Sequence, residues 1–312
     1  MTKPAFRGGP VHVRVPATSA NLGPGFDCLA LALDLQDDLI ARAGEDGLLI
    51  DVAGEGADLP RDETNLVVRS MRTTFDRLGG QPRGLELSCA NRIPHSRGLG
   101  SSAAAIIAGI LLARGLVLGG EQTLPDADVL ALANELEGHP DNVAAALLGG
   151  LTIAWTGGAV AQAIRRDCDA RIRPVVFVPP FSASTEQARG LLPAMVPHGD
   201  AAFNAARAAL LVAALTSAPE LLLPATEDRL HQSYRAEAML QSAALVTGLR
   251  AAGHAAVISG AGPTVLVLAQ DELEVQQLQA FSPAHWRVLN LAVDRVGAHL
   301  VPAVSSAGTV PQ

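Results

Sequence analysis

The stretch 91–104 contains the residue types that could bind a phosphate group. An apolar, strand-like run ends at Pro94, and residues 98–102 (Gly-Leu-Gly-Ser-Ser) then open an Ala-, Ile- and Leu-rich segment that predicts a helix. Glycine has no Cβ, so the backbone can turn tightly there and approach a ligand closely. The first amides of a helix have no partner inside it, and the aligned peptide dipoles make that end partly positive. With two serine hydroxyls beside it, this helix start is suited to binding phosphate.

Three interpretations of residues 98–104 compete. A glycine-capped loop before an ordinary buried helix is the plainest, and a lone Gly-x-Gly would favour it. A dinucleotide fingerprint fits Gly98, Gly100 and Ala103, but it needs its first glycine directly at the end of a strand, and here the strand ends well before. The third is a nucleotide-phosphate loop other than Walker A. The chain has a single lysine, Lys3, which argues against a Walker, protein-kinase or Schiff-base lysine.

Two further segments are unusually polar for simple connections. Residues 17–27 are denser in turn formers and small polar side chains than a turn needs, so they form either a long hairpin loop or a substrate loop that supplies Asn21 and Asp27. Residues 134–142 lie between two apolar helical segments. The carboxyl end of a helix is partly negative, so acidic residues there are repelled and destabilise the helix unless a cation such as Mg²⁺ binds them. A solvated connection between helices is the alternative for this second segment.

Length, composition and charge narrow the class of protein. The chain of 312 residues is 49% apolar and 17% charged, which supports a sizeable aliphatic core and allows two domains. A formal charge of −8 argues against a nucleic-acid-binding surface, so local amides, arginines and metal would have to hold an anionic nucleotide. Three widely spaced cysteines indicate neither a disulfide framework nor a zinc site, and they suit a reducing cytoplasm. No segment predicts a signal peptide or a membrane-spanning helix.

Predicted strands and helices are interleaved along both halves of the chain. In the first half we expect strands at 11–16, 38–43, 48–53, 84–93 and 151–155, with helices at 66–78, 101–115 and 129–136. In the second half we expect strands at 174–179, 255–258, 265–269 and 286–293, with helices at 201–215 and 272–281 and a pair of helices within 228–250. Short turns between some strands favour α+β layers over a doubly wound sheet. We place the division into two domains at residues 1–160 and 161–312.

Four separated patches resemble the GHMP small-molecule kinases. They are residues 13–27 (Val-Arg-Val-Pro-Ala-Thr-Ser-Ala-Asn-Leu-Gly-Pro-Gly-Phe-Asp), 94–104 (Pro-x-x-x-Gly-Leu-Gly-Ser-Ser-Ala-Ala), 137–144 (Glu-Gly-His-Pro-Asp-Asn-Val-Ala) and 258–264 (Ile-Ser-Gly-Ala-Gly-Pro-Thr). Each patch alone is a weak signal, and all four in this order are a strong one. The resemblance implies the two-domain α+β fold of these kinases. Its N-terminal, ATP-binding domain is ribosomal-protein-S5-like, and its C-terminal α/β domain is ferredoxin-like.

Several segments are most similar to the homoserine kinase branch of this family, including Ser-Thr-x-x-Ala-Arg at 184–189 and Leu-His-Gln-x-Tyr-Arg at 230–235. This resemblance implies ATP-dependent phosphorylation of the L-homoserine hydroxyl to O-phospho-L-homoserine, a step of threonine biosynthesis. The alternatives are a GHMP kinase for another small alcohol and a nucleotide-binding relative without catalysis. We expect small-molecule partners only, with no nucleic acid and no membrane. The sequence does not decide the oligomeric state, and a homodimer is allowed.

The resemblance also assigns substrate-binding roles. Homoserine is a zwitterion, so it needs donors for its carboxylate and an acceptor for its ammonium group. Arg189 and Arg235 would supply planar, bidentate donors, and Asp27 would accept from the ammonium group. Asn21 and His139 would position the rest of the molecule.

Catalysis and nucleotide binding are assigned in the same way. Asn142 occupies the position at which other family members use an aspartate, so no strong base is expected, and Asp141 is the candidate if one exists. Mg²⁺ is expected on Ser102 and Glu135, with Glu135 preferred to Glu137. The residues expected to bind ATP are Asn65, Pro94, Arg97, Gly98, Leu99, Gly100, Ser101, Ser102, Ala103, Ala104, Gly260 and Gly262.

Overall fold

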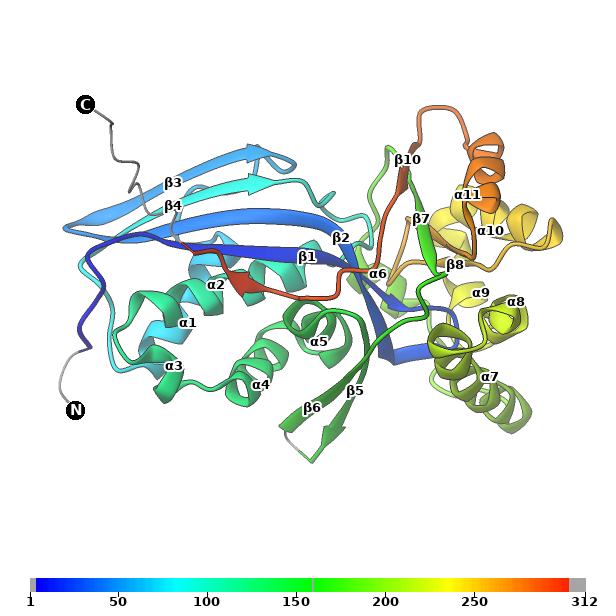
Figure 1. Ribbon diagram of the computed structural model, residues 1–312, viewed down its shortest axis with the longest axis horizontal. Helices are drawn as coiled ribbons and strands as arrows, with labels where there is room; N and C mark the ends of the chain where they lie inside the picture. Colours follow the sequence, from blue (N-terminus) through cyan, green and yellow to red (C-terminus); the bar gives the residue numbers. More distant parts are fainter. Residues whose placement is uncertain (1–3, 159, 303–312) are drawn as a thin grey trace, which may run out of the picture.

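The computed structural model describes residues 4–158 and 160–302. It has two parts side by side, and each part is a β-sheet with helices packed against it (Figure 1). The larger part is a long sheet with helices α1–α5 packed beneath it, and the smaller part is a second sheet with its own helices. Within the described residues, none of the helices combines the length and the apolar character needed to cross a membrane.

The first sheet has seven strands and contributes one side of the site. Its strands are β1 (Val11–Asn21), β2 (Gly25–Gly44), β3 (Gly47–Gly54), β4 (Gly84–Asn91), β5 (Leu151–Gly157), β6 (Val160–Arg166) and β11 (His299–Leu300). The order is β11-β1-β2-β4-β3, and β5 pairs with both β2 and β6. Only the β3–β4 pair is parallel among these described pairings. The tight β1–β2 connection carries the residues around Asp27 to the domain junction.

The helices of the first domain are α1 (Leu66–Arg77), α2 (Ser101–Leu116), α3 (Gly120–Thr123), α4 (Asp126–Glu137) and α5 (Pro140–Leu148). Helix α2 is apolar on nearly every side, and most of its residues are buried between the sheet and α1. Its core position fixes the start of the helix in space, because a fully packed helix cannot slide without opening a cavity. The predicted phosphate-binding end therefore belongs to a helix that is packed into the core of the domain.

The second sheet has the strand order β10-β7-β9-β8, with all neighbours antiparallel. Its strands are β7 (Arg173–Val178), β8 (Ala256–Ile258), β9 (Val265–Ala269) and β10 (Arg287–Asn290). Its helices are α6 (Thr185–Gly190), α7 (His198–Thr216), α8 (Leu222–Ala225), α9 (Gln232–Arg235), α10 (Leu240–Ala251) and α11 (Glu272–Leu278). Helices separate β7 from β8 and β9 from β10, which is the ferredoxin-like arrangement. The predicted fold class is confirmed.

Several element predictions differ from the structure in ways that packing explains. The strand expected at 38–43 is only the end of β2, which has 20 residues. Its apolar first half is buried by α5 and β5, and a short apolar run does not distinguish a buried strand from a helix. The pair of helices expected within 228–250 is present as α9 and α10, which a 3₁₀ turn separates. Strands β6 and β11 were not predicted.

The domain boundary stays a prediction. Strand β6 completes a hairpin with β5 on the first sheet, so the chain passes to the second sheet only between residues 167 and 172. Strand β11 then returns to pair with β1. We propose that the connection lies at 167–172 rather than at 160, with the last described segment belonging to the first domain.

Candidate active site

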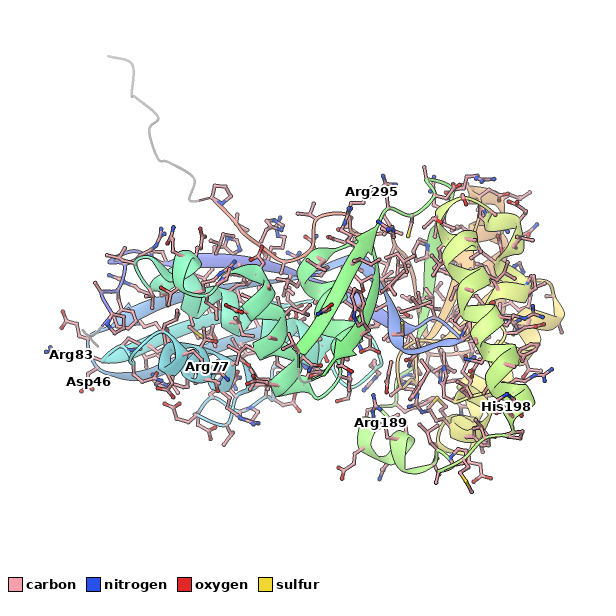
Figure 2. All side chains as sticks on the ribbon, turned by 90° about the horizontal axis from the view of Figure 1, so that it is seen from below. Asp46, Arg77, Arg83, Arg189, His198 and Arg295 are labelled. Carbon is pink, nitrogen blue, oxygen red and sulfur yellow. The ribbon has the colours of Figure 1, made fainter. Side chains whose placement is uncertain are left out.

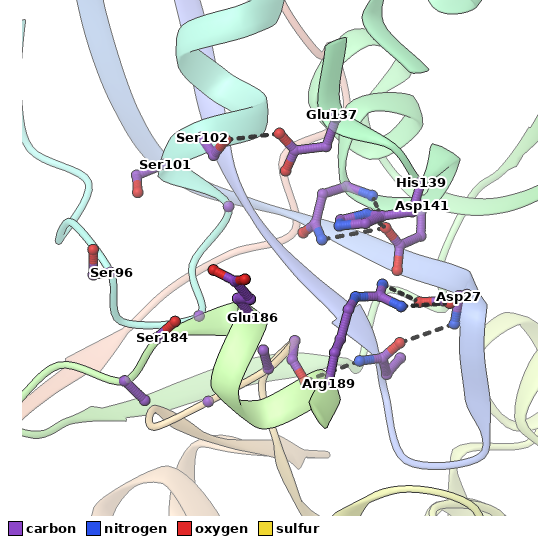
Figure 3. Close-up of a pocket in the computed structure, with 18 of the residues that line it drawn as sticks. Asp27, Ser96, Ser101, Ser102, Glu137, His139, Asp141, Ser184, Glu186 and Arg189 are labelled. Carbon is purple, nitrogen blue, oxygen red and sulfur yellow. Dashed lines mark hydrogen bonds and ion pairs between the residues drawn. The ribbon is translucent and has the colours of Figure 1, made fainter. Parts of the chain in front are cut away.

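A cleft of about 440 Å³ lies where the two domains meet (Figure 3). Its walls come from the β1–β2 turn, the loop before α2, the ends of α4 and α5 that face each other, α6, and the turn before β9. The lining residues are Asn21, Asp27, Ser96, Gly98, Gly100, Ser101, Ser102, Glu137, His139, Asp141, Asn142, Ala183, Ser184, Glu186, Arg189, Arg235, Gly260, Ala261 and Gly262. All four sequence patches therefore contribute to one cleft.

The start of α2 faces this cleft with unpaired amides. Gly100 caps the helix in the left-handed region at φ 70°, and the first helical bond runs from the Ala104 amide to the Gly100 carbonyl, at 2.9 Å. In the described part of the chain, the amides of residues 100–103 donate to no other protein group. A Cβ at Gly100 would collide with the Thr18 hydroxyl oxygen. Glycine is therefore required at this helix start, which is suited to bind phosphate.

Hydrogen bonds from both domains hold the loop before α2. The Ser259 hydroxyl donates to the Gly98 carbonyl at 2.6 Å, and the Thr18 amide donates to the Leu99 carbonyl at 3.0 Å. The Arg97 guanidinium donates to the carbonyls of His95, Pro179 and Pro180, at 3.0, 3.2 and 3.1 Å. Arg97 lines a neighbouring crevice rather than this cleft. The structure thus places Arg97 as a tie between the domains, where the sequence predicted a nucleotide contact.

Several other predicted nucleotide residues do not present a side chain to the cleft. The side chains of Leu99, Ala103 and Ala104 are buried in the core, so they fix the helix and leave its amides to face the cleft. Gly260 and Gly262 lie at the cleft wall, both at positive φ, and the Gly260 amide donates to the Ala20 carbonyl at 3.0 Å. The glycine-rich turn before β9 therefore closes against the loop before α2.

Glu137, not Glu135, lies beside Ser102. The Ser102 hydroxyl donates to Glu137 Oε2 at 2.7 Å (Figure 3). Glu135 is exposed and pairs with Arg77 at 2.7 Å. Residues two apart on a helix point to opposite sides, because each residue turns the helix by about 100°. Burial raises the pKa of Glu137, and the bond from Ser102 opposes that rise. The preference for Glu135 as a metal ligand does not fit this arrangement.

The Ser102 hydroxyl and Glu137 carboxylate are oxygen ligands of the kind that Mg²⁺ takes. Among the described residues, no group of three or more His, Cys, Asp or Glu side chains could hold a metal ion. Mg²⁺ in nucleotide sites usually binds one or two protein oxygens together with waters and substrate phosphates. These two side chains fit that mode, since they lie beside the phosphate-binding amides.

Asp141 is the centre of a hydrogen-bonded group at the start of α5. Its Oδ1 accepts from His139 Nδ1 at 3.0 Å and from the Asn142 amide at 2.6 Å. Asn142 accepts in turn from the Thr18 hydroxyl at 2.7 Å, which fixes its side-chain amide. The hydrogen bond to Asp141 raises the pKa of His139, and burial opposes that rise. Thr18 was not singled out by sequence, although a buried hydroxyl in an apolar strand was a usable signal.

Asp27 and Arg189 form a two-pronged ion pair across the domain junction. Arg189 Nη2 donates to Asp27 Oδ1 at 2.7 Å and Nη1 donates to Oδ2 at 3.0 Å. Figure 2 labels Arg189 on α6, beside the gap between the two parts of the molecule. Asn21 holds this turn, because its Oδ1 accepts from the Asp27 amide at 3.0 Å and its Nδ2 donates to the Gly260 carbonyl at 2.9 Å. Sequence reasoning placed Asp27 and Arg189 at opposite ends of a substrate, and here they contact each other.

Arg235 is almost completely buried, with 2% of its surface exposed, yet it lines the cleft. Its Nε donates to the Ala188 carbonyl at 3.2 Å, and its guanidinium carbon lies 5.2 Å from the centre of the Phe26 ring. The Arg189 guanidinium carbon lies 5.7 Å from the same ring, so Phe26 contacts both cations. Burial lowers the pKa of Arg235, which remains charged at neutral pH. Phe26 was not singled out as a site residue from the sequence.

A second cavity of about 190 Å³ lies on the other side of the α2 start. Asn65 lines it and caps α1. Its Oδ1 accepts from the Val67 amide at 3.0 Å, and its Nδ2 donates to the Pro60 carbonyl at 2.9 Å. Both ends of this side chain are therefore committed to the fold.

Comparisons with known proteins decide the family. The GHMP kinase N-terminal domain matches residues 65–150, and the GHMP kinase C-terminal domain matches residues 205–288. The chain belongs to the GHMP kinase family. The homoserine kinase of Streptomyces coelicolor is 60% identical over 99% of this chain and 100% of its own length. That of Streptomyces avermitilis is 61% identical over 97% of this chain and 99% of its own length.

Solved structures agree with this family assignment. A putative homoserine kinase from Listeria monocytogenes superposes with a TM-score of 0.76 at 33% identity, over 94% of this chain and 99% of its own. Homoserine kinase from Cytophaga hutchinsonii, at 24% identity and a TM-score of 0.80 over 96% of this chain and all of its own, shares the fold. The predicted family and the class of ATP-dependent kinase are confirmed. The roles of individual site residues stay predictions.

Proposed function

We propose that this GHMP kinase transfers the γ-phosphoryl group of ATP to the side-chain hydroxyl of L-homoserine, giving O-phospho-L-homoserine for threonine biosynthesis. One observation carries the proposal. Unpaired helix amides face a carboxylate and two guanidinium groups across a single cleft, so a nucleotide phosphate and an amino acid can meet there. The names of the relatives at 60% and 61% identity support this choice among GHMP kinases.

The amino acid binds by replacing one ion pair with two. Its ammonium group takes the place of Arg189 on Asp27, and its carboxylate binds the Arg189 guanidinium that is released. Roughly a third of each of the two side chains is exposed, so their mutual attraction in water is weak and opening the pair costs little. Arg235 keeps the local potential positive from beneath, which favours the carboxylate on that side.

The triphosphate binds along the start of α2. The amides of residues 100–103 supply fixed donors that need no reorganisation, and the Ser101 hydroxyl adds another. Ser102 and Glu137 would hold Mg²⁺ next to these amides. When bound, Mg²⁺ neutralises charge on the phosphate oxygens.

Catalysis rests on positioning rather than on a strong base. Asp141 Oδ1 is occupied by His139 and Asn142, so its second oxygen is left to accept a hydrogen bond from the substrate hydroxyl. Asn142 is locked between Thr18 and Asp141 and keeps that carboxylate in one orientation. Phosphoryl transfer needs little basicity when the hydroxyl is aligned with the γ-phosphate.

Release of ADP with a panel of alcohols tests the proposal. L-Homoserine, mevalonate and galactose are each supplied with ATP and Mg²⁺, and ADP is measured by a coupled assay. We expect L-homoserine to give the highest kcat/KM and phosphate to appear on its side-chain oxygen. Preference for mevalonate or a sugar would replace the assignment with another GHMP activity, and ATP binding without transfer would support a non-catalytic relative.

We also propose a cytoplasmic location, because three free thiols suit a reducing compartment. The homodimer stays a prediction, which sedimentation of the purified protein would test.

A further inference from the structure

The cavity behind the start of α2 has a polar group that the proposed reaction does not use. Ser96, Ser101 and Ser102 line both this cavity and the cleft, so a nucleotide with its phosphates on the α2 amides reaches into it. The remaining lining residues are mostly apolar: Asp37, Leu39, Val52, Leu59, Pro60, Asn65, Leu66, Val67, Cys89, Asn91, His95 and Ala105. A flat heteroaromatic base suits such walls.

Asp37 is a carboxylate at the floor of this cavity with 5% of its surface exposed. It occupies an inward position of β2, in line with Leu39 and Ala41, where the other side chains are aliphatic and buried. In the described part of the chain it forms no ion pair. Arg92 lies near enough to lower the pKa of Asp37, but its ion pair is with Asp38. A buried acid without an ion pair is costly, so its retention calls for a partner of another kind.

Only one oxygen of Asp37 is satisfied by the protein. Oδ1 accepts from the Arg92 amide at 2.6 Å and from the Ile93 amide at 2.9 Å, just before the loop that leads to α2. Oδ2 accepts from no group in the described residues, and it is not among the fully enclosed atoms left without a partner. This second oxygen is therefore a hydrogen-bond acceptor open to the cavity.

The neighbouring amides in the cavity wall are already occupied. Asn65 donates to Pro60 and accepts from the first turn of α1. Asn91 donates its amide to the Glu55 carbonyl at 3.1 Å. The Asn91 Oδ1 accepts from no group in the described residues, so it is a second, neutral acceptor in this wall. Asp37 is thus the charged acceptor of the sheet floor that a ligand donor can reach without breaking a bond of the fold.

We propose that Asp37 selects the nucleotide base: its Oδ2 accepts a hydrogen bond from the exocyclic 6-amino group of adenine. This inference rests on the proposed use of ATP. An adenine presents a donor at that position, whereas a 6-oxopurine presents a carbonyl oxygen that a carboxylate repels. Because the acceptor is buried and charged, the mismatch is expected to cost more than the loss of an ordinary hydrogen bond.

The test compares ATP with inosine triphosphate, which differs at the 6-position. Burial raises the pKa of Asp37 to about 6, so assays at pH 8 keep it ionised. For the unmodified enzyme we expect kcat/KM for ATP to exceed that for inosine triphosphate by roughly 10- to 100-fold. In Asp37→Asn the amide oxygen must keep facing the Arg92 and Ile93 amides, so the NH₂ group faces the cavity. The preference should then fall at least tenfold and move toward inosine triphosphate.

Asp38→Asn is the matched control, because Asp38 is the next residue on β2 and pairs with His12 and Arg14 outside the cavity. It should leave the preference between the two nucleotides unchanged. Equal use of both nucleotides by the unmodified enzyme would overturn the proposal. Equal weakening of both by Asp37→Asn would overturn it too, since Asp37 would then only anchor the loop.

Two further measurements keep the test independent of variant folding and of the second substrate. Purine riboside triphosphate, which lacks any 6-substituent, should bind the unmodified enzyme at least tenfold more weakly than ATP, and equal binding would contradict the proposal. Competition against a fluorescent ATP analogue, without any alcohol present, reports this selectivity directly. Selective binding without turnover of L-homoserine would leave the base-selection proposal standing and remove only the substrate assignment.

Discussion

The acidic residues of the two cavities on either side of the α2 start have different kinds of partners. In the cleft between the domains, Asp27 contacts Arg189, Asp141 contacts His139, and Glu137 accepts from Ser102. In the cavity behind the helix, Asp37 has backbone amides on one oxygen and no ion pair with any described residue. The cleft is therefore arranged to exchange charged partners with a charged ligand. The cavity is arranged to bury an uncharged base against one acceptor.

Exposure explains why each arrangement is stable. About a third of the Asp27 and Arg189 side chains is exposed, so water screens the pair and either partner can be replaced. Asp37 is almost completely buried, so its charge is costly and two short bonds from main-chain amides must hold it. Because the serines at the start of α2 line both spaces, one helix end separates a polar site from an apolar one.

The largest effect is expected where the cleft would hold metal. Glu137→Gln should lower kcat/KM about 10³-fold, or roughly 4 kcal/mol, because a neutral amide holds Mg²⁺ poorly beside Ser102. Titration of activity with Mg²⁺ should show a higher requirement. Glu135→Gln is the control, since Glu135 pairs with Arg77 on the surface, and it should stay within twofold of the unmodified enzyme. A reversed order would restore the preference for Glu135.

The second prediction is that the raised pKa of buried Asp37 makes the stability of the protein depend on pH. Burial raises the pKa of Asp37 from 3.8 to about 6, so the folded state binds a proton that the unfolded state has already lost between pH 4 and 6. Asp37 therefore stabilises the fold below pH 4, and that contribution is lost as pH rises through 6. Relative to Asp37→Asn, the unmodified protein should lose about 2 kcal/mol of unfolding free energy between pH 4 and 7. Urea unfolding of both proteins measures the difference, and a flat difference would contradict the sign.

The third prediction concerns the exchangeable ion pair of the cleft. Arg189→Ala should raise KM for L-homoserine roughly 10- to 100-fold, since charge-assisted bonds to a carboxylate are worth about 1.5–3 kcal/mol. KM for ATP should change little. Arg165→Ala removes a similarly exposed arginine that pairs with Asp167 on β6, and it serves as the control. Equal weakening of both substrates by Arg189→Ala would place that residue outside amino-acid binding.

The smallest expected effect is that of Asn65→Ala, which tests whether Asn65 binds the base or only lines the cavity. Asn65 lines the cavity behind α2, but its side chain caps α1. Asn65→Ala should cost about 1 kcal/mol of stability through the lost cap, as measured by urea unfolding. The preference for ATP over inosine triphosphate should remain. A loss of that preference would show that Asn65, rather than Asp37, contacts the base.

Some site residues could be predicted from the sequence, and others could not. Gly98 and Gly100 were assigned from local chemistry, and both have the positive φ and close neighbours that only glycine tolerates. The choice between Glu135 and Glu137 as a metal ligand stays a prediction. Only Glu137 lies beside Ser102, because the side chain that faces the cleft depends on how α4 is rotated about its axis. Rotation is set by packing against α2 and α5, which no local pattern reports. Arg97 was expected to contact nucleotide, and the structure ties it to Pro179 and Pro180 of the other domain.

The sequence by itself determined the family, the kinase class and the positions of the four patches. Motif order and the need for glycine in a tight turn depend on residues that are close together in the chain. Only the tertiary structure decided which side chains face one another. The pairing of Asp27 with Arg189 joins residues 162 positions apart, and Asp37 becomes a lone buried acid only after β2, β4 and α1 have closed around it. Charge and burial depend on neighbours in space, so partners of this kind cannot be derived from one chain segment at a time.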